Sequence, residues 1–264
     1  MLRVGAVSYL NTRPLIYGLR ERLQGLGVLS LNLPSRLADD LATGRLDVAL
    51  IPSIEFLRGI DRGYRVISDA AITCHGPVWS VRLLSRVPIS QIRSLALDEG
   101  SRTSAALVQV LLKELHGLSP QIVPLRIEQV PESVVADAVL LIGDRAMHPP
   151  TDVFEEIWDL GERWCDGTGL PFVFAMWVAR TELANSDALK QTLKAARDDG
   201  LRHLEKIAKH EAGAHGLTIP ALHRYFDQNL HFQLGSREWD GLELFRSKAT
   251  RQGLLNPPLV HFQT

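Results

Sequence analysis

The sequence predicts an α/β protein of two lobes that face each other across a cleft. Short apolar runs typical of buried strands alternate with helical patterns through the first part of the chain. Several of these runs end in polar turns that lead into helices, as in strand–helix units around a parallel sheet. Two longer apolar segments, residues 76–85 and 169–179, are suited to carry the chain from one lobe to the other and back. These features predict a hinged binder whose cleft closes on a ligand.

The first lobe is expected to begin with a strand at residues 3–7, a polar turn and a helix that starts at Pro14. Proline suits the first helical turn because its missing N–H is not needed there, and Asn11 or Thr12 is the natural cap. Repeated strand–helix units predict a parallel sheet covered on both faces. The other elements expected here are strands at residues 28–33, 47–52, 64–67 and 70–73, and short helices at residues 36–43 and 53–57.

The second lobe is expected to begin with a strand at residues 94–97 and a helix that ends near Gly117, with a polar turn between them. The two crossing segments divide the chain into lobe one, residues 1–85 plus 179–264, and lobe two, residues 86–178.

The later elements expected in lobe two are strands at residues 121–125 and 138–142, a polar turn at 143–146 and an irregular piece at 158–161. The elements expected after the return to lobe one are a helix from Ser186 that closes at Gly213 and Gly216, a helix from Ile219, a last helix around 240–245 and a fraying tail after Leu255.

Composition limits the classes of function. Of the 264 residues, 45% are hydrophobic, which is enough for a large core. The formal net charge is −1, which argues against nucleic-acid binding through phosphate neutralisation. No run of about 18 apolar residues is present, so no membrane span is expected. The first strand begins without a basic and apolar leader, so we expect no secretory signal and a cytoplasmic protein.

The cysteine and histidine patterns predict neither a disulfide nor a metal site. Cys74 and Cys165 are far apart and follow no CxxC spacing, as expected for thiols in a reducing compartment. The nine histidines form no HxH, HExxH or Cys/His ligand spacing. The chain also lacks the GxGxxG, Walker A and GxSxG motifs, so we expect no cofactor.

Two polar turns are candidates for binding an anion. Residues 8–12 and residues 101–104 each follow a strand and precede a helix. Such turns gather small polar side chains and free N–H groups at the carboxyl edge of a sheet. From the local pattern alone, the first turn is equally well interpreted as a plain loop, whereas the second is better interpreted as a helix cap rich in Ser and Thr. A third polar turn begins at Gly143 after another strand.

Five segments spread over essentially the whole chain carry a family resemblance. They are SYLNTRPL (residues 8–15), GRLDVALIPSIEF (44–56), LDEGSRTSAAL (97–107), IGDRA (142–146) and DLGERWCDGTGLPFVFAMW (159–177). Together, and in this order, they resemble the chorismate dehydratases, the family that catalyses the first step of the futalosine route to menaquinone.

The resemblance implies a type 2 periplasmic-binding-protein-like fold, which agrees with the two lobes, the two crossover strands and the cleft expected above. It also implies a reaction in which chorismate loses water to give 3-[(1-carboxyvinyl)oxy]benzoate, without a cofactor or a metal. The sister enzyme of the pathway, 1,4-dihydroxy-6-naphthoate synthase, shares the fold and is the alternative, although SYLNTRPL is closer to the dehydratase. A non-catalytic cytosolic protein that binds a carboxylate is the alternative of another class.

The resemblance implies roles for particular residues. By match to the family's motif, Asn11 is the first side chain expected beside the reacting ring, and Ser80 is the second. Each would hold the leaving hydroxyl or orient the proton acceptor. Without the resemblance, Asn11 is interpreted as a helix cap and Ser80 as a strand residue. The residues expected to bind the substrate are Ser8, Tyr9, Ser53, Ser101, Thr103, Ser104, Gly143 and Asp144.

No residue is an obvious strong base. Glu55 and Asp144 follow strand ends but have ordinary structural roles there, and His75 lies beside the first crossing segment. Arg13 and Arg102 flank the two turns and are interpreted either as carboxylate partners or as solvent-facing side chains. The substrate offers another proton acceptor, because the enolpyruvyl carboxylate of chorismate hangs beside C3. Our hypothesis is that this carboxylate takes the proton, with a protein base as the alternative.

Overall fold

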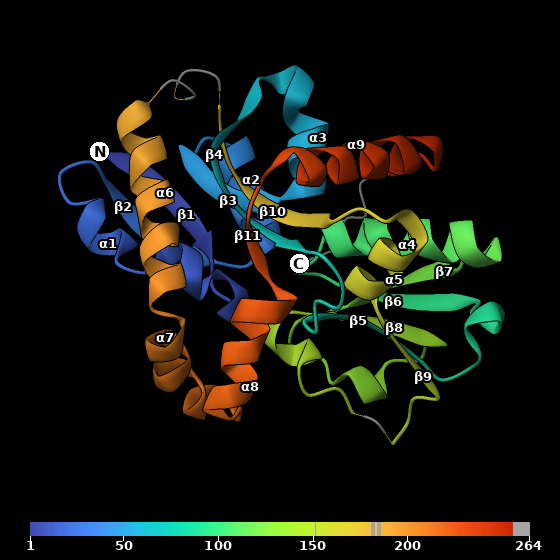
Figure 1. The fold of residues 1–264 in the computed structure, drawn as a ribbon. Coiled ribbons are helices and arrows are strands. Elements are labelled where there is room, and N and C mark those ends of the chain that lie inside the picture. Colours follow the sequence, from blue (N-terminus) through green and yellow to red (C-terminus); the bar gives the residue numbers. More distant parts are fainter. Residues whose placement is uncertain (151, 181–182, 184–185, 256–264) are drawn as a thin grey trace.

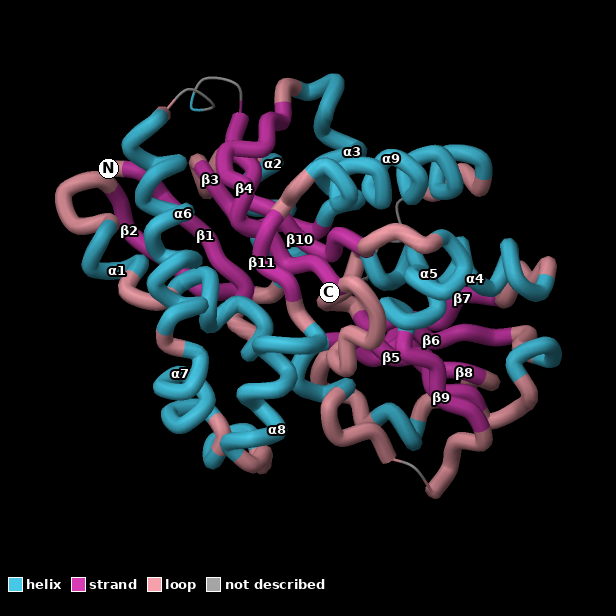
Figure 2. Tube along the Cα trace, in the orientation of Figure 1, coloured by secondary structure: helices cyan, strands magenta, loops and turns pink. Residues whose placement is uncertain are grey.

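In the computed structural model, the described residues are 1–150, 152–180, 183 and 186–255. They form two sheets, which lie beside each other with helices around both (Figure 1). The tube in Figure 2 shows the strands of the two sheets as two separate magenta groups. The predicted α/β architecture of two lobes is therefore confirmed, and the tail expected to fray after Leu255 lies outside the described residues.

The sheet of the first lobe has six strands. In spatial order they are β11 (His231–Gln233), β4 (Tyr64–Cys74), β10 (Phe172–Arg180), β3 (Val48–Pro52), β1 (Leu2–Val7) and β2 (Gly27–Asn32). β1 is parallel to β2 and β3 because helical segments return the chain between them. β10 arrives from the other lobe and runs antiparallel to β3 and β4.

The sheet of the second lobe repeats this topology. Its five strands, in spatial order, are β7 (Gln121–Leu125), β6 (Ser94–Asp98), β8 (Ala138–Ile142), β5 (Val81–Ser85) and β9 (Glu156–Asp159). β6 is parallel to β7 and β8, and β5 is antiparallel to β8 and β9. The order β7-β6-β8-β5-β9 thus matches β2-β1-β3-β10-β4 of the first lobe. β1 and β6 hold equivalent places, and so do the turns that follow them.

The two crossings are shorter than the sequence suggests. β5 pairs within the second sheet, although its residues were assigned to lobe one by the boundary at residue 85. β10 pairs within the first sheet, although lobe one was expected to resume only at residue 179. The segments that connect the sheets are residues 75–80 and 169–171. Each long apolar run therefore combines a short crossing with a strand of the sheet that it enters.

Helices cover the faces of both sheets (Figure 1), with α4 and α5 packed on the second sheet. The α-helices are α1 (Leu19–Arg22), α2 (Pro34–Ala42), α3 (Ser53–Gly59), α4 (Thr103–His116), α5 (Leu160–Thr168), α6 (Asp187–Arg202), α7 (Leu204–Glu211), α8 (Ile219–Arg224) and α9 (Ser236–Arg251). The 3-10 turns are η1 (Leu10–Ile16), η2 (Ile60–Arg62), η3 (Ile89–Gln91), η4 (Pro131–Ser133), η5 (Gly143–Ala146) and η7 (Gly213–His215), and η8 (Tyr225–Asn229) is a π-helical turn.

Several local expectations were wrong. The irregular piece expected around Trp158 is the strand β9 followed by the helix α5, which Asp159 caps by accepting from two backbone N–H groups. The helix expected from Ser186 to Gly213 divides at His203 into α6 and α7. The two strands expected after Tyr64 are the single strand β4, and β11 was not predicted. Short strands and helix breaks leave little trace in an apolar pattern.

The helix α6 packs against η1 and holds it in place. The two elements pack against each other, and the backbone of Gly200 in α6 touches the backbone of Pro14 in η1. A side chain at Gly200 would overlap the Pro14 carbonyl oxygen, so only glycine permits this approach. Leu10 and Leu15 of η1 are fully buried in the core. The first polar turn is therefore fixed by its packing against α6 and the core.

Two further findings concern the chain as a whole. No helix within the described ranges is long and apolar enough to span a bilayer. Cys74 and Cys165 are free thiols, as expected, but they are neighbours in space. The Cys165 sulfur lies 3.9 Å from the Cys74 carbonyl oxygen, where β4 and α5 meet beside the crossings.

Candidate active site

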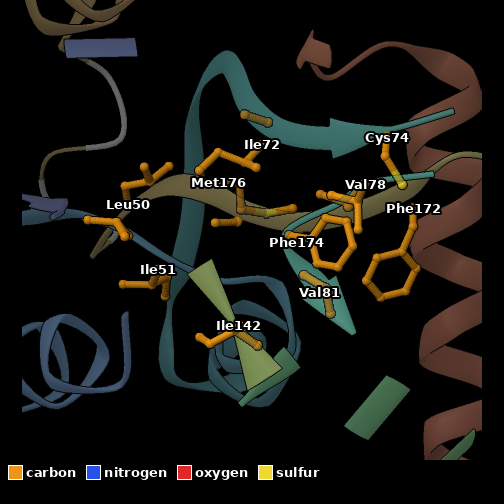
Figure 3. Close-up of a cluster of buried hydrophobic side chains, with 14 of the residues drawn as sticks. Leu50, Ile51, Ile72, Cys74, Val78, Val81, Ile142, Phe172, Phe174 and Met176 are labelled. Carbon is orange, nitrogen blue, oxygen red and sulfur yellow. The ribbon is translucent and has the colours of Figure 1, made fainter. Parts of the chain in front are cut away.

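A cavity with about 500 Å³ of empty space, part of it open to solvent, lies between the two sheets. Both lobes contribute apolar walls, and Figure 3 shows several of these side chains packed around Phe174. The apolar lining is Val7, Pro34, Pro52, Ile72, Val78, Val81, Ile142, Phe174 and Ala175. The remaining lining is Tyr9, Asn11, Ser80, Gly100, Ser101, Arg102, Thr103, Ser104 and Gly143.

The first polar turn presents Tyr9 and Asn11 to the cavity from η1. It is a 3-10 turn, in which Thr12 N donates to the Tyr9 carbonyl at 3.1 Å and Pro14 lies inside. No side chain caps η1, and the Asn11 Oδ1 instead accepts from Thr12 Oγ1 at 3.1 Å. The expectation of a helix that starts at Pro14 with Asn11 or Thr12 as its cap is therefore wrong. The Asn11 amide nitrogen donates to no other described residue and is available to a ligand.

The second polar turn leads into α4, a helix of 14 residues. Ser101, Thr103 and Ser104 all line the cavity, and no side chain caps the first N–H groups of the helix. The positive end of the helix dipole and these N–H groups therefore favour an anion in the cavity. Thr103 also links the lobes, because its Oγ1 accepts from Ile54 N at 3.3 Å and lies 3.4 Å from Ser53 Oγ.

Ser80 lies in a tight turn at the end of the first crossing. Trp79 has a φ of 64°, which is uncommon for a residue other than glycine, and Ser80 N donates to the Val78 carbonyl at 2.7 Å. The Asp159 carboxylate fixes the turn, since it accepts from Val78 N at 2.9 Å and from Trp79 N at 2.6 Å. Gly143 N donates to the Ser80 carbonyl at 2.8 Å. The extended conformation expected for Ser80 is thus wrong, and the turn holds it at the cavity wall.

Gly143 joins the cavity wall through its backbone. Its φ is 62°, and a Cβ there would lie 2.9 Å from the Tyr9 ring, so both the conformation and the contact require glycine. Asp144 follows it but lies outside the lining. The Asp144 carboxylate accepts from Leu10 N at 3.0 Å and lies 3.5 Å from His215 Nε2. Asp144 therefore ties η5 to η1 across the two lobes.

Two other predicted residues lie outside the lining. Ser53 is fully buried, and its hydroxyl donates to the Val173 carbonyl at 2.7 Å. Ser8 uses its backbone N–H to donate to the Asn32 carbonyl at 3.1 Å. The predicted residues that the structure brings together around the cavity are Tyr9, Asn11, Ser80, Ser101, Thr103, Ser104 and Gly143.

Asp98 is a buried carboxylate behind the second turn. It accepts from Gly100 N at 2.9 Å and from Arg145 Nη1 at 3.3 Å. Burial raises the pKa of Asp98 to about 6, although the hydrogen bond from Gly100 opposes this shift. A Cβ at Gly100 would lie 3.0 Å from the Tyr9 hydroxyl and 3.2 Å from Asp98 Oδ1, so the two side chains meet beside Gly100. Burial raises the pKa of the Tyr9 phenol above its ordinary value. The Tyr9 hydroxyl is buried and has no hydrogen-bond partner among the described residues.

The two arginines that flank the turns are paired with protein carboxylates. Arg102 Nη2 lies 2.9 Å from both carboxylate oxygens of Asp39, and Arg102 Nη1 lies 3.4 Å from Glu55. Arg13 Nε lies 3.3 Å from Glu211. Neither guanidinium is thus an unpaired cation for a substrate carboxylate.

None of the three candidate bases lines the cavity. Glu55 pairs with Arg58 and Arg102, and Asp144 holds η1 as described above. His75 Nε2 lies 2.6 Å from Glu238 Oε1, outside the cavity. The lining formed by the described residues contains no Asp, Glu or His. The described ranges also contain no cluster of three or more His, Cys, Asp or Glu side chains that would hold a metal ion.

Comparison with known proteins identifies the family. A family model described as menaquinone biosynthesis matches residues 2–251. The chain belongs to the menaquinone biosynthesis family. One relative, the chorismate dehydratase of Thermus thermophilus, is 34% identical over 259 residues, which cover 92% of this chain and 93% of that protein.

Solved structures share the fold of this family member. Protein AF1704 of Archaeoglobus fulgidus matches with a TM-score of 0.77 and 15% identity, over 96% of this chain and 98% of that one. A Candida albicans protein described as having the generic periplasmic binding protein fold matches with a TM-score of 0.56 and 11% identity, over 100% of this chain and 98% of that one. At these identities the likeness concerns the fold alone, and it confirms the expected periplasmic-binding-protein-like architecture.

The sequence analysis did not predict several features of the cavity. The apolar wall around Phe174 comes from segments that were interpreted only as crossings or core strands. Asp98 and Asp159 were not singled out, although each ends a strand directly before a turn or helix. That position was the available signal, because a carboxylate there can accept from the N–H groups of the following turn.

Proposed function

We propose that this protein is a chorismate dehydratase. It would be a cytoplasmic carbon–oxygen lyase that eliminates water from chorismate to give 3-[(1-carboxyvinyl)oxy]benzoate in the futalosine route to menaquinone. One observation carries the proposal: the cavity takes lining residues from each of the five segments in which the sequence resembles chorismate dehydratases. One residue from each segment is Asn11, Pro52, Ser101, Gly143 and Phe174. The relative in Thermus thermophilus, named for this activity, supports it.

The two carboxylates of chorismate need fixed partners. The start of α4 supports binding of one of them, because residues 101–104 line the cavity and no side chain caps the first N–H groups of the helix. The Tyr9 phenol, neutral and without a partner among the described residues, is a further donor from the opposite lobe. The apolar wall around Phe174 suits the ring of the substrate. Orientation of this kind supplies up to about 7–11 kcal/mol of the barrier in favourable systems.

Asn11 and Ser80 are the proposed catalytic residues. The Asn11 amide nitrogen and the Ser80 hydroxyl both belong to side chains that line the cavity, one from η1 and one from the turn before β5. Each can donate a hydrogen bond to the C4 oxygen as negative charge develops on it. Donors aimed at developing charge are among the largest contributions to catalysis.

The substrate itself is the proposed proton acceptor. The enolpyruvyl carboxylate takes the C3 proton, the electron pair of the C3–H bond forms a ring double bond, and the C4–O bond breaks. The departing hydroxide recovers the proton and leaves as water, so atoms and charge balance without an oxidant or reductant. The cavity supports this route because no Asp, Glu or His from the described part of the chain lines it. Tyr9 is no substitute base, since burial raises its pKa.

The test is to incubate the purified protein with chorismate and to follow the diene absorbance. We expect the absorbance to fall while 3-[(1-carboxyvinyl)oxy]benzoate appears in stoichiometric amount. Unchanged chorismate together with tight binding of an aromatic carboxylate would instead indicate a non-catalytic binding protein. Turnover of a futalosine-derived compound would indicate the sister synthase.

A further inference from the structure

Tyr225 is a buried phenol behind the cavity with no role in the account above. It begins the π-helical turn η8, which follows α8, and its side chain is fully buried. The Tyr225 hydroxyl makes no hydrogen bond of ordinary geometry to any described residue. Burying a hydroxyl without a partner costs free energy, and π-helical turns are often found at functional sites. The Tyr225 hydroxyl is therefore a candidate for a role in the cavity beside it.

The neighbours of Tyr225 are the strained residue Trp79 and the catalytic candidate Ser80. The Tyr225 and Trp79 rings meet edge to face, with centroids 5.5 Å apart and planes at 75°. Ser80 follows Trp79 directly. Burial raises the pKa of Tyr225, and the Ser80 side chain acts in the opposite direction and lowers it. The Tyr225 hydroxyl therefore belongs to a ring that packs on the residue next to Ser80, and it forms no hydrogen bond of ordinary geometry with Ser80 or any other described residue.

The Ser80 hydroxyl has no strong partner of its own. Its Oγ lies 3.4 Å from the Val78 carbonyl, at the weak limit of a hydrogen bond. The backbone around it, by contrast, is held firmly by the Asp159 carboxylate and by Gly143 N. The backbone position of Ser80 is fixed, while the direction of its hydroxyl is left to another group.

We propose that Tyr225 is a positioning residue, whose hydroxyl donates a hydrogen bond to Ser80 Oγ and directs the Ser80 proton into the cavity. The role rests on the proposed function, because it acts on the Ser80 hydroxyl that would hold the leaving oxygen of chorismate. A serine hydroxyl has one proton, so accepting from Tyr225 frees that proton for the substrate. A hydroxyl that accepts one hydrogen bond also becomes a better donor for the next.

The experiment is a double-mutant cycle on Tyr225→Phe and Ser80→Ala, measured as kcat and KM for chorismate. Tyr225→Phe keeps the ring that packs on Trp79 and removes only the oxygen. We expect kcat to fall roughly tenfold, as for loss of one hydrogen bond, with KM changed less than about twofold. In the Ser80→Ala background, Tyr225→Phe should change kcat by less than about twofold, because there is no hydroxyl left to direct.

Tyr64→Phe is the matched control. Tyr64 is also buried but lies at the start of β4 and does not line the cavity, so its loss of a hydroxyl should leave kcat unchanged. Thermal unfolding of each variant checks that the fold is retained.

Two results would overturn the role of Tyr225. One is a Tyr225→Phe variant with the wild-type kcat. The other is the same loss of kcat with and without the Ser80 hydroxyl, which a purely structural effect would give. A wild-type protein that leaves chorismate unchanged would overturn the proposed function, and with it this role.

Discussion

The turns after β1 and β6 hold equivalent places in two sheets of the same topology, yet they are built differently. After β1 the chain forms η1, a 3-10 turn of seven residues that carries Pro14. After β6 it forms α4, an α-helix of 14 residues whose first N–H groups have no side-chain cap. Both turns line one cavity. The same topological position therefore offers two kinds of polar group to one ligand.

This difference suggests a division of roles. A long α-helix presents a dipole and several parallel N–H groups, which suit a fixed negative charge. A short 3-10 turn has little dipole and presents individual side chains, here Tyr9 and Asn11, which suit directional hydrogen bonds. We infer that α4 holds a substrate carboxylate, while Asn11 acts on the group that leaves.

The largest expected effect comes from removing the side chain of the first turn. Asn11→Ala should lower kcat by roughly 10²–10³-fold, the usual cost of losing one donor aimed at developing charge. The fold should persist, because the only hydrogen bond that the Asn11 side chain makes to a described residue is the one from Thr12 Oγ1. Steady-state kinetics with chorismate, together with thermal unfolding, provide the measurement.

Asn32→Ala is the control for this variant, because Asn32 ends β2 outside the cavity lining. It should keep the wild-type kcat. If Asn11→Ala has the same kcat as Asn32→Ala, the Asn11 side chain takes no part in the chemistry.

The buried carboxyl of Asp98, which precedes the second turn, should make the free energy of unfolding depend on pH. The pKa of Asp98 is raised to about 6 from 3.8, so the folded state holds a proton there that the unfolded state has lost. The stability from Asp98 is fully present below about pH 4 and is lost as the pH rises through about 6. The free energy of unfolding of the wild type, minus that of Asp98→Asn, should therefore fall by up to about 3 kcal/mol over this range. Chemical denaturation at several pH values measures it, and a constant difference would contradict the buried carboxyl.

A charge added at the start of α4 tests the anion site. Ser104→Asp should raise KM roughly tenfold, because the new carboxylate would occupy the position proposed for that of the substrate. The helix dipole favours an acidic residue there, so the protein should still fold. Ser119→Asp adds the same charge at an exposed position beyond the other end of α4 and should leave KM unchanged. Equal KM values for the two variants would argue against a carboxylate at this helix end.

The smallest effects are expected at the three groups that might replace the substrate as proton acceptor. Glu55→Gln, His75→Ala and Asp144→Asn should each keep kcat within about tenfold of the wild type, about the effect of losing one ordinary hydrogen bond. All three lie outside the cavity lining. Measured turnover and chorismate binding together decide the point. If one variant still binds chorismate but turns it over several orders of magnitude more slowly, proton removal by the substrate is the wrong mechanism.

The sequence could predict those parts of the fold that depend on local pattern. The apolar run of β3 and the periodic apolar pattern of α4, which ends at Gly117, specify a strand and a helix within a few residues. The polar turns at strand ends likewise pointed to residues that line the cavity, among them Asn11 and Ser101. These predictions rest on short-range chemistry that is written into neighbouring residues.

The parts that failed depend on contacts between distant segments. The φ of Trp79 is held by the Asp159 carboxylate, which lies 80 residues further along the chain. Ser53 and Thr103 approach each other only because the two sheets meet, so Ser53 joins a contact between lobes and lies outside the cavity lining. η1 packs against Gly200 of α6, which lies far along the chain. The residue pattern within one segment does not predict contacts with such distant partners.

Mass analysis of the product formed from chorismate is the decisive measurement of the dehydration. Wild-type protein should convert chorismate to a single aromatic product that has lost one water and kept its enolpyruvyl ether, and Asn11→Ala should form it far more slowly. Recovery of intact chorismate from the wild-type reaction, or a product that has lost the enolpyruvyl group, would contradict the account.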